Sequence, residues 1–101
     1  MSRTVVVTGC SSGFGRRVSE RLARSGDRVY ATMRDIAGKN SGIAGELRTL
    51  ASAERLDLRV LELDVASTTS VNTAAAQVSK ESGAPDVVIN NAGQMYVGLT
   101  E

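Results

Sequence analysis

The residues best placed to do chemistry lie near the amino terminus, in the glycine-rich segment TGCSSGFG at positions 8–15. Gly9 would let the chain turn sharply, Gly13 would leave no side chain where a phosphate approaches the backbone, and Gly15 would let a helix lie close to a strand. The N–H groups at the start of that helix would then meet a pyrophosphate. A plain strand-to-helix turn usually needs only one glycine, and no lysine follows as a P-loop requires. The segment therefore predicts a dinucleotide site, whose contacts are Gly9, Ser11, Ser12, Gly13, Phe14 and Gly15.

A second feature, about 20 residues further along the chain, predicts which dinucleotide binds. An acidic residue there would accept hydrogen bonds from the ribose 2′-hydroxyl of NAD(H) and repel the 2′-phosphate of NADP(H). Met33 falls at this position and does neither. Arg34 follows, and its planar guanidinium suits a phosphate dianion, with the Ser12 hydroxyl as a further donor. We therefore predict NADP(H), with Arg34 as a contact. A shift of one residue would give the carboxylate of Asp35 the deciding role and favour NAD(H).

Apolar patterns predict the elements that would position these residues. Apolar residues between turn signals indicate strands over 4–8, 28–33, 58–63 and 86–90; the first is a continuous β-branched run, which is typical of a strand buried on both faces. Spacings of three and four residues indicate helices over 14–25, around 43–50, and from a Ser67 cap to Gly83. The inward residues would be Phe14, Val18 and Leu22 in the first helix and Val71, Ala74, Ala75 and Val78 in the third.

The alternation of strands and helices predicts the fold class. The order βαβαβαβ indicates an α/β protein with a parallel sheet and helices on both faces. Right-handed crossovers give the strand order 3-2-1-4 of a Rossmann-type sheet. Only eleven residues follow Asn90, too few for another strand-helix unit. We therefore expect residues 1–101 to form one partial domain, half of a doubly wound fold without its carboxyl-terminal half.

The composition excludes several other classes of protein. A net charge of +1 over 101 residues provides no strong field for nucleic acid or a membrane surface. One cysteine permits no internal disulfide, and without histidine a zinc site lacks its usual ligands. The amino-terminal apolar run is too short for a signal peptide or a membrane helix. We therefore expect a cytoplasmic protein with no metal site that binds neither nucleic acid nor membrane.

The glycine segment and two later motifs together resemble the short-chain dehydrogenase/reductase family. The family fingerprint Thr-Gly-x-x-x-Gly-x-Gly matches positions 8–15, while LDV at 63–65 and NNAG at 90–93 follow the third and fourth predicted strands. The match covers essentially the whole chain, and segments 8–13 and 29–35 look most like the steroid and retinol dehydrogenase branch. The resemblance implies an NADP(H)-dependent oxidoreductase that interconverts alcohols and ketones by hydride transfer.

The resemblance also implies roles for the two later motifs. Asp64 would hydrogen-bond the adenine amino group, with Val65 beside the ring; in the simpler alternative, Asp64 is a turn residue that leads into a helix. Asn90 would brace the middle of the sheet, or would be an ordinary polar strand end. The implied cofactor contacts are Asp64, Val65, Asn91, Ala92 and Gly93, with the last two along the ribose.

The catalytic pair of that family is missing from these residues. Family members use Tyr-x-x-x-Lys on one helix, where the lysine lowers the pKa of the tyrosine. Here Tyr30 is followed four residues later by Arg34, and Tyr96 by Thr100. We therefore assign no catalytic residue, expect this polypeptide alone not to transfer hydride, and expect the residues that contact an alcohol or carbonyl substrate to lie outside it.

Other readings stay open from the sequence. The same fold would serve a non-catalytic half-domain that binds nucleotide or self-associates. A methyltransferase that uses S-adenosylmethionine also has a glycine-rich first turn, although Met33 stands where it would want an acidic residue. The strand over 86–90 would be a sheet edge despite its apolar composition. We therefore expect a homo-oligomer formed through this edge; aggregation, or pairing with a further segment, is the alternative.

Overall fold

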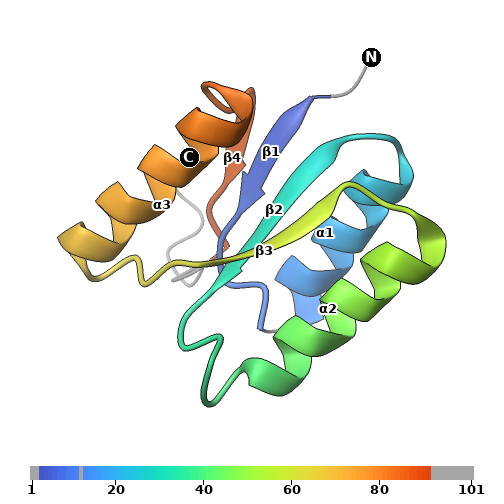
Figure 1. The fold of residues 1–101 in the computed structure, drawn as a ribbon, viewed down its shortest axis with the longest axis horizontal. Coiled ribbons are helices and arrows are strands. Elements are labelled where there is room, and N and C mark those ends of the chain that lie inside the picture. Colours follow the sequence, from blue (N-terminus) through green and yellow to red (C-terminus); the bar gives the residue numbers. More distant parts are fainter. Residues whose placement is uncertain (1–2, 12, 92–101) are drawn as a thin grey trace.

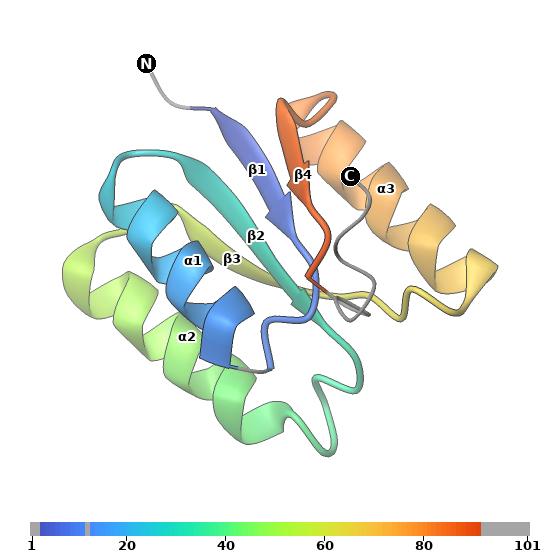
Figure 2. The same ribbon diagram turned by 180° about the vertical axis from the view of Figure 1, so that it is seen from behind.

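The computed structural model describes residues 3–11 and 13–91. Within them, one parallel sheet contains four strands in the order β3-β2-β1-β4. Helices α1 and α2 cover one face of this sheet and α3 covers the other (Figure 1, Figure 2). The predicted Rossmann-type order is therefore confirmed. The elements are β1 (Thr4–Val7), α1 (Gly13–Arg24), β2 (Arg28–Met33), α2 (Ser41–Glu54), β3 (Leu58–Glu62), α3 (Thr68–Ser82) and β4 (Val87–Ile89).

The first strand is buried more completely on one face than on the other. Val5 and Val7 are fully buried on the side of α1 and α2. Val6, on the opposite side, is only half-buried, because it borders an open apolar groove beside α3. The prediction of burial on both faces is therefore only half right. None of the described helices is long and apolar enough to cross a bilayer.

Helix α1 contacts the sheet through small residues. Gly15, Ser19 and Ala23 form its buried face, and the Ser19 hydroxyl donates to the Gly15 carbonyl over 2.9 Å. Phe14 is 67% exposed, so its predicted place on the inward face is wrong. Small side chains let the helix lie close to the strands. The other two residues predicted to face inward, Val18 and Leu22, are half-buried and pack against the core, so the prediction fails only at Phe14.

Helix α3 begins and ends where the sequence predicts. The Ser67 hydroxyl accepts a hydrogen bond from the N–H of Ser70, and Gly83 follows the last turn with a φ of 79°. Of the four residues predicted to face inward, Ala74 and Val78 are buried. Val71 and Ala75 are exposed, and both border the apolar groove between α3 and the sheet. Those two positions were predicted wrongly because α3 leaves part of this face open.

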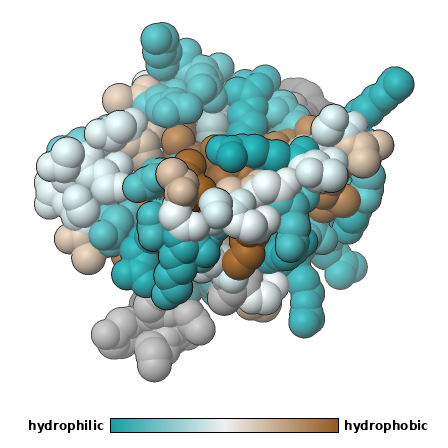
Figure 3. Space-filling view, turned by 60° about the horizontal axis from the view of Figure 1, so that its bottom comes forward, coloured by the Kyte–Doolittle hydropathy of each residue, from teal (hydrophilic) through white to brown (hydrophobic). Residues whose placement is uncertain are grey.

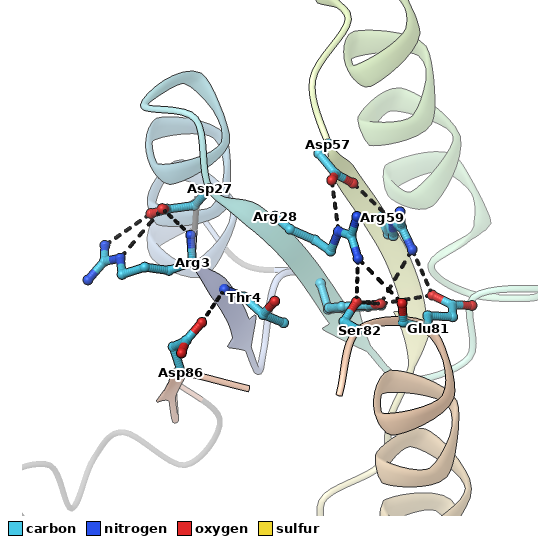
Figure 4. Close-up of polar contacts among 10 residues, drawn as sticks. Arg3, Thr4, Asp27, Arg28, Asp57, Arg59, Glu81, Ser82 and Asp86 are labelled. Atoms are coloured by element: carbon cyan, nitrogen blue, oxygen red, sulfur yellow. Dashed lines mark hydrogen bonds and ion pairs between the residues drawn. The ribbon is translucent and has the colours of Figure 1, made fainter. Parts of the chain in front are cut away.

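A polar network joins the carboxyl-terminal end of α3 to the amino-terminal ends of β2 and β3 (Figure 4). The Tyr30 hydroxyl donates to the Glu81 carboxylate over 2.8 Å, and the Arg59 guanidinium meets the same oxygen at 2.9 Å. Beside this cluster, Asp27 is buried at the start of β2 and accepts hydrogen bonds from the side chain and the backbone N–H of Arg3. These contacts stabilise the amino-terminal ends of the strands, which lie opposite the glycine-rich loop.

We expect this network to make the fold sensitive to acid. Hydrogen bonds from Arg3 hold the pKa of Asp27 below its usual value, and hydrogen bonds from Tyr30, Gln77 and Arg59 do the same for Glu81. A lowered folded-state pKa contributes stability above the unfolded values of about 4, and that stability is lost as pH falls through the folded values. Urea unfolding between about pH 5 and pH 2 checks this. The Glu81→Gln variant should show a shallower loss, whereas equal slopes in both proteins would contradict the prediction.

Candidate functional site

The glycine-rich loop lies at the carboxyl edge of the sheet, between β1 and α1. Gly9 has a φ of 70°, a backbone conformation that favours glycine. The Cys10 N–H donates to the Thr32 carbonyl over 2.9 Å, and its thiol contacts the Val7 carbonyl at 3.2 Å. Burial raises the pKa of the Cys10 thiol, so this side chain is a neutral anchor in the core. The loop is thus held against β1 and β2.

Residues that follow β4 hold the same loop from the other side. The Thr8 hydroxyl donates to the Asn90 side-chain oxygen and accepts from the Asn91 N–H, both over 2.9 Å. The Asn91 side-chain amide donates to the Gly9 carbonyl over 3.1 Å. These bonds join the carboxyl ends of β1 and β4, which fits the bracing role implied for Asn90. Asn91 is buried with its side chain on the loop; its contact with a cofactor stays a prediction.

The other two glycines of the loop differ in their surroundings. A Cβ on Gly15 would lie 2.6 Å from the Gly9 carbonyl oxygen and 2.8 Å from the side-chain nitrogen of Asn91, closer than van der Waals contact allows. A Cβ on Gly13 would meet nothing within 4 Å. Gly13 is the first residue of α1, and the first turn of that helix carries no acidic residue. A side chain at position 13 would therefore extend into open space, and its absence leaves room for a phosphate group at the start of α1.

The remaining predicted contacts of the loop are Ser11, Ser12 and Phe14. Ser11 is exposed in the turn before α1, and Phe14 is exposed beside it. Figure 3 shows this end of the molecule, where hydrophilic side chains surround apolar ones. Ser12, Ala92 and Gly93 lie outside the described residues.

A recess of about 380 Å³ lies at the carboxyl ends of β2 and β3. Met33, the last residue of β2, is buried, while Arg34 is exposed and forms no ion pair within residues 3–11 and 13–91. The structure thus places an exposed cation directly after the end of β2. The recess is lined by Arg34, Asp35, Lys39, Asn40, Glu62 and Asp64.

Two of the carboxylates in this recess accept hydrogen bonds from their own turns. Asp35 has a φ of 51°, and its Oδ2 accepts from the Lys39 N–H over 3.0 Å. Asp64 accepts from the Ala66 N–H over 3.0 Å, so it has the turn role given as its simpler alternative. The contact of Asp64 with adenine stays a prediction, as does that of Val65, which is 51% exposed.

Sequence reasoning did not single out several residues that shape the site. Glu62 and Lys39 line the recess, so that it contains a third carboxylate and a second cation besides those predicted. Glu62 is paired in register with Met33. Strand alternation could have revealed Glu62, since it follows the buried Leu61 at the end of β3. Thr8 stands in the fingerprint itself, but its bond to Asn90 depends on the pairing of β1 with β4.

Comparison with known proteins places this geometry in a family. The family model described as short chain dehydrogenase matches residues 3–101. The chain is 39% identical over 105 residues to 17-beta-hydroxysteroid dehydrogenase type 1 of Homo sapiens, covering 100% of this chain and 31% of that protein. It is 36% identical over 93 residues to retinol dehydrogenase 12 of Mus musculus, covering 92% of this chain and 28% of that protein.

Solved structures agree with the observed fold. Menthone neomenthol reductase from Mentha piperita superposes with a TM-score of 0.76 at 27% identity, over 90% of this chain and 31% of that one. An actinorhodin polyketide ketoreductase crystallised with NADPH gives a TM-score of 0.72 at 30% identity, over 89% of this chain and 33% of that one. The chain therefore spans about a third of the length of the relatives it matches.

Proposed function

This chain belongs to the short-chain dehydrogenase family, and from that premise we propose that it is the NADP(H)-binding part of an oxidoreductase that interconverts alcohols and ketones. When bound, the dinucleotide supplies or accepts a hydride at its nicotinamide ring. The residues of this chain bind and orient it. The observation that carries the proposal is that Gly13 is exposed at the start of α1 and has open space where a side chain would lie.

The choice of NADP(H) over NAD(H) rests on the residues that follow β2. The exposed guanidinium of Arg34 provides the donors that a phosphate dianion accepts. The carboxylate of Asp35, which would favour NAD(H) if it reached the ribose, is hydrogen-bonded within its own loop. Glu62 and Asp64 line the same recess and oppose a further negative charge, so the preference depends on Arg34 and Lys39.

Thermal unfolding with each cofactor tests the proposal. A ligand that binds the folded chain alone raises its stability by about 2.7 kcal/mol at a hundred times its Kd. We expect NADPH to raise the Tm of the chain and an equal concentration of NADH to raise it much less. An unchanged Tm with both cofactors would contradict the proposal. If both cofactors raise the Tm, but no longer polypeptide that contains this chain transfers hydride, the chain is instead a non-catalytic nucleotide-binding module.

We expect these 101 residues alone not to transfer hydride. The sequence holds no Tyr-x-x-x-Lys pair, and proton transfer by such a positioned group typically contributes a factor of about 10²–10⁴ to the rate. The decrease in NADPH absorbance during incubation of the purified chain with a panel of ketones checks this. Steady oxidation above the rate without protein would show the expectation to be wrong.

Self-association through β4 is the second part of the proposal. β4 is an edge strand of three apolar residues, and its middle residue, Val88, is 59% exposed. Beside it lies an apolar groove of about 320 Å³, bordered by Val6, Leu61 and Val71 among others. Pairing of β4 with the same strand of a second copy would satisfy its outer backbone groups and cover Val88.

Val88→Asp tests this pairing. Charged side chains on an edge strand oppose its pairing with another strand, so we expect the variant to be a monomer at concentrations where the original chain is a dimer. Light scattering after size exclusion measures the mass of each. A chain that is monomeric before the substitution would contradict the proposed pairing.

The cytoplasm is the proposed compartment. Cys10 is a free, buried thiol, which suits a reducing environment. Imaging of a fluorescent fusion would check the location, and enrichment in a secreted fraction would contradict it.

A further inference from the structure

The loop between β2 and α2 contains a close contact that the proposed function does not use. A Cβ on Gly38 would lie 2.6 Å from Asp35 Oδ1, 3.0 Å from its Oδ2 and 3.1 Å from its Cγ. The carboxylate of Asp35 therefore fills the space that a side chain at position 38 would need. No comparable contact with a carboxylate surrounds Gly13, Gly42 or Gly45, where a Cβ would meet nothing within 4 Å.

Hydrogen bonds within the loop hold Asp35 in this position. Its Oδ2 accepts from the Lys39 N–H over 3.0 Å, and its backbone carbonyl accepts from the N–H groups of Gly38 and Asn40 over 3.2 and 3.0 Å. The Asn40 side chain in turn donates to the Arg34 carbonyl over 2.6 Å. The loop thus holds the carboxylate of Asp35 in place, and the bond from Asn40 holds the backbone of Arg34.

We propose that Gly38 is a cofactor-specificity residue that acts through Asp35, by leaving room for its carboxylate to stay away from the ribose 2′ position. The inference rests on the proposed function of the recess as the 2′-phosphate site. Asp35 directly follows Arg34, and both line that recess. A carboxylate released from the loop would repel a 2′-phosphate, or pair with Arg34 and weaken its attraction for the phosphate.

Gly38→Ala would release that carboxylate at small cost to the fold. The atoms that the new methyl group meets belong to the end of the Asp35 side chain, which can rotate, and not to backbone. A carboxylate within about 4–5 Å of a phosphate dianion in a solvated site opposes binding by one or two kcal/mol, which corresponds to roughly tenfold in Kd. The ribose 2′-hydroxyl of NADH would instead find an acceptor.

The test measures the Kd of NADPH and of NADH for the full chain and for its variants by isothermal titration calorimetry. We define selectivity as the Kd of NADH divided by that of NADPH. We expect Gly38→Ala to lower selectivity about tenfold. In the Gly38→Ala, Asp35→Asn double variant, which keeps the new methyl group but removes the charge, selectivity should return to the original value. A general loss of structure would weaken both cofactors alike and leave the ratio unchanged.

Asp35→Asn alone keeps the proposal falsifiable if Gly38→Ala does not fold. The amide oxygen can still accept from Lys39, so selectivity should change less than about threefold, whereas a rise of tenfold or more would mean that the carboxylate already faces the phosphate. Unchanged selectivity in a folded Gly38→Ala variant, or no recovery in the double variant, would overturn this inference alone. An original chain that binds neither cofactor would overturn the proposed function and this inference with it.

Discussion

Replacing Gly15 with alanine is expected to lower the free energy of unfolding by roughly 1–3 kcal/mol and to abolish measurable binding of NADPH. The added methyl group would lie 2.6 Å from the Gly9 carbonyl oxygen, which is backbone and cannot rotate away. It would also lie 2.8 Å from the Asn91 side-chain nitrogen, the donor that holds that carbonyl. Helix α1 would have to move outward, and the loop that faces the phosphates would lose its brace.

Two other glycines provide matched controls for this substitution. Gly45→Ala adds a methyl group inside α2 where nothing lies within 4 Å, so it should raise stability by about 0.5–1 kcal/mol and leave binding unchanged. The methyl group of Gly13→Ala would also meet nothing within 4 Å in the described part of the chain, but it would occupy the space assigned to a phosphate. It should weaken NADPH binding with little loss of stability. Urea unfolding and calorimetric titration measure both quantities. Original stability and affinity in Gly15→Ala would contradict the close approach seen at this position.

Replacing Arg34 with alanine is expected to weaken NADPH binding by about 10- to 100-fold and to leave NADH binding nearly unchanged. A hydrogen bond to a charged group contributes about 1.5–3 kcal/mol, which gives this range, and only NADP(H) carries the 2′-phosphate. The exposure of Arg34 and the absence of an ion pair to it among the described residues mean that its removal should change stability little.

Arg48→Ala is the control for the loss of one positive charge. Arg48 is exposed on α2 and forms no ion pair in the described part of the chain, and it does not line the recess. It should leave the Kd of NADPH nearly unchanged at physiological salt, because exposed charges are screened over about 8 Å. If Arg34→Ala leaves the ratio of the two Kd values unchanged, the proposed recognition of the 2′-phosphate is wrong.

The strand order could be predicted because it depends on rules that act on the whole chain. Apolar runs separated by helical spacings indicate parallel strands, and right-handed crossovers then allow few arrangements. The inward face of α1 could not be predicted from apolar spacing alone. There, Gly15, Ser19 and Ala23 lie against the sheet because close approach favours small side chains, and Phe14 is left exposed.

The candidate site was predictable where a motif fixes backbone geometry and less so where side chains from distant strands meet. The turn at Gly9 follows from the glycine spacing, but the contact of Asn91 with its carbonyl requires the pairing of β1 with β4. Similarly, the sequence places Asp35 beside Arg34 without showing which way its carboxylate points. That direction depends on the left-handed backbone conformation of Asp35 and on the space that Gly38 leaves by having no side chain.

Titration of the isotopically labelled chain with NADPH, followed by amide resonances in NMR spectra, tests the central assignment most directly. If the paired phosphates contact the backbone at the start of α1, the amide signals of Gly9, Ser11, Gly13 and Gly15 should shift and saturate together, with a further shift at Arg34. Saturable shifts confined to another surface, such as the apolar groove beside α3, would contradict the account, and so would no shift at all.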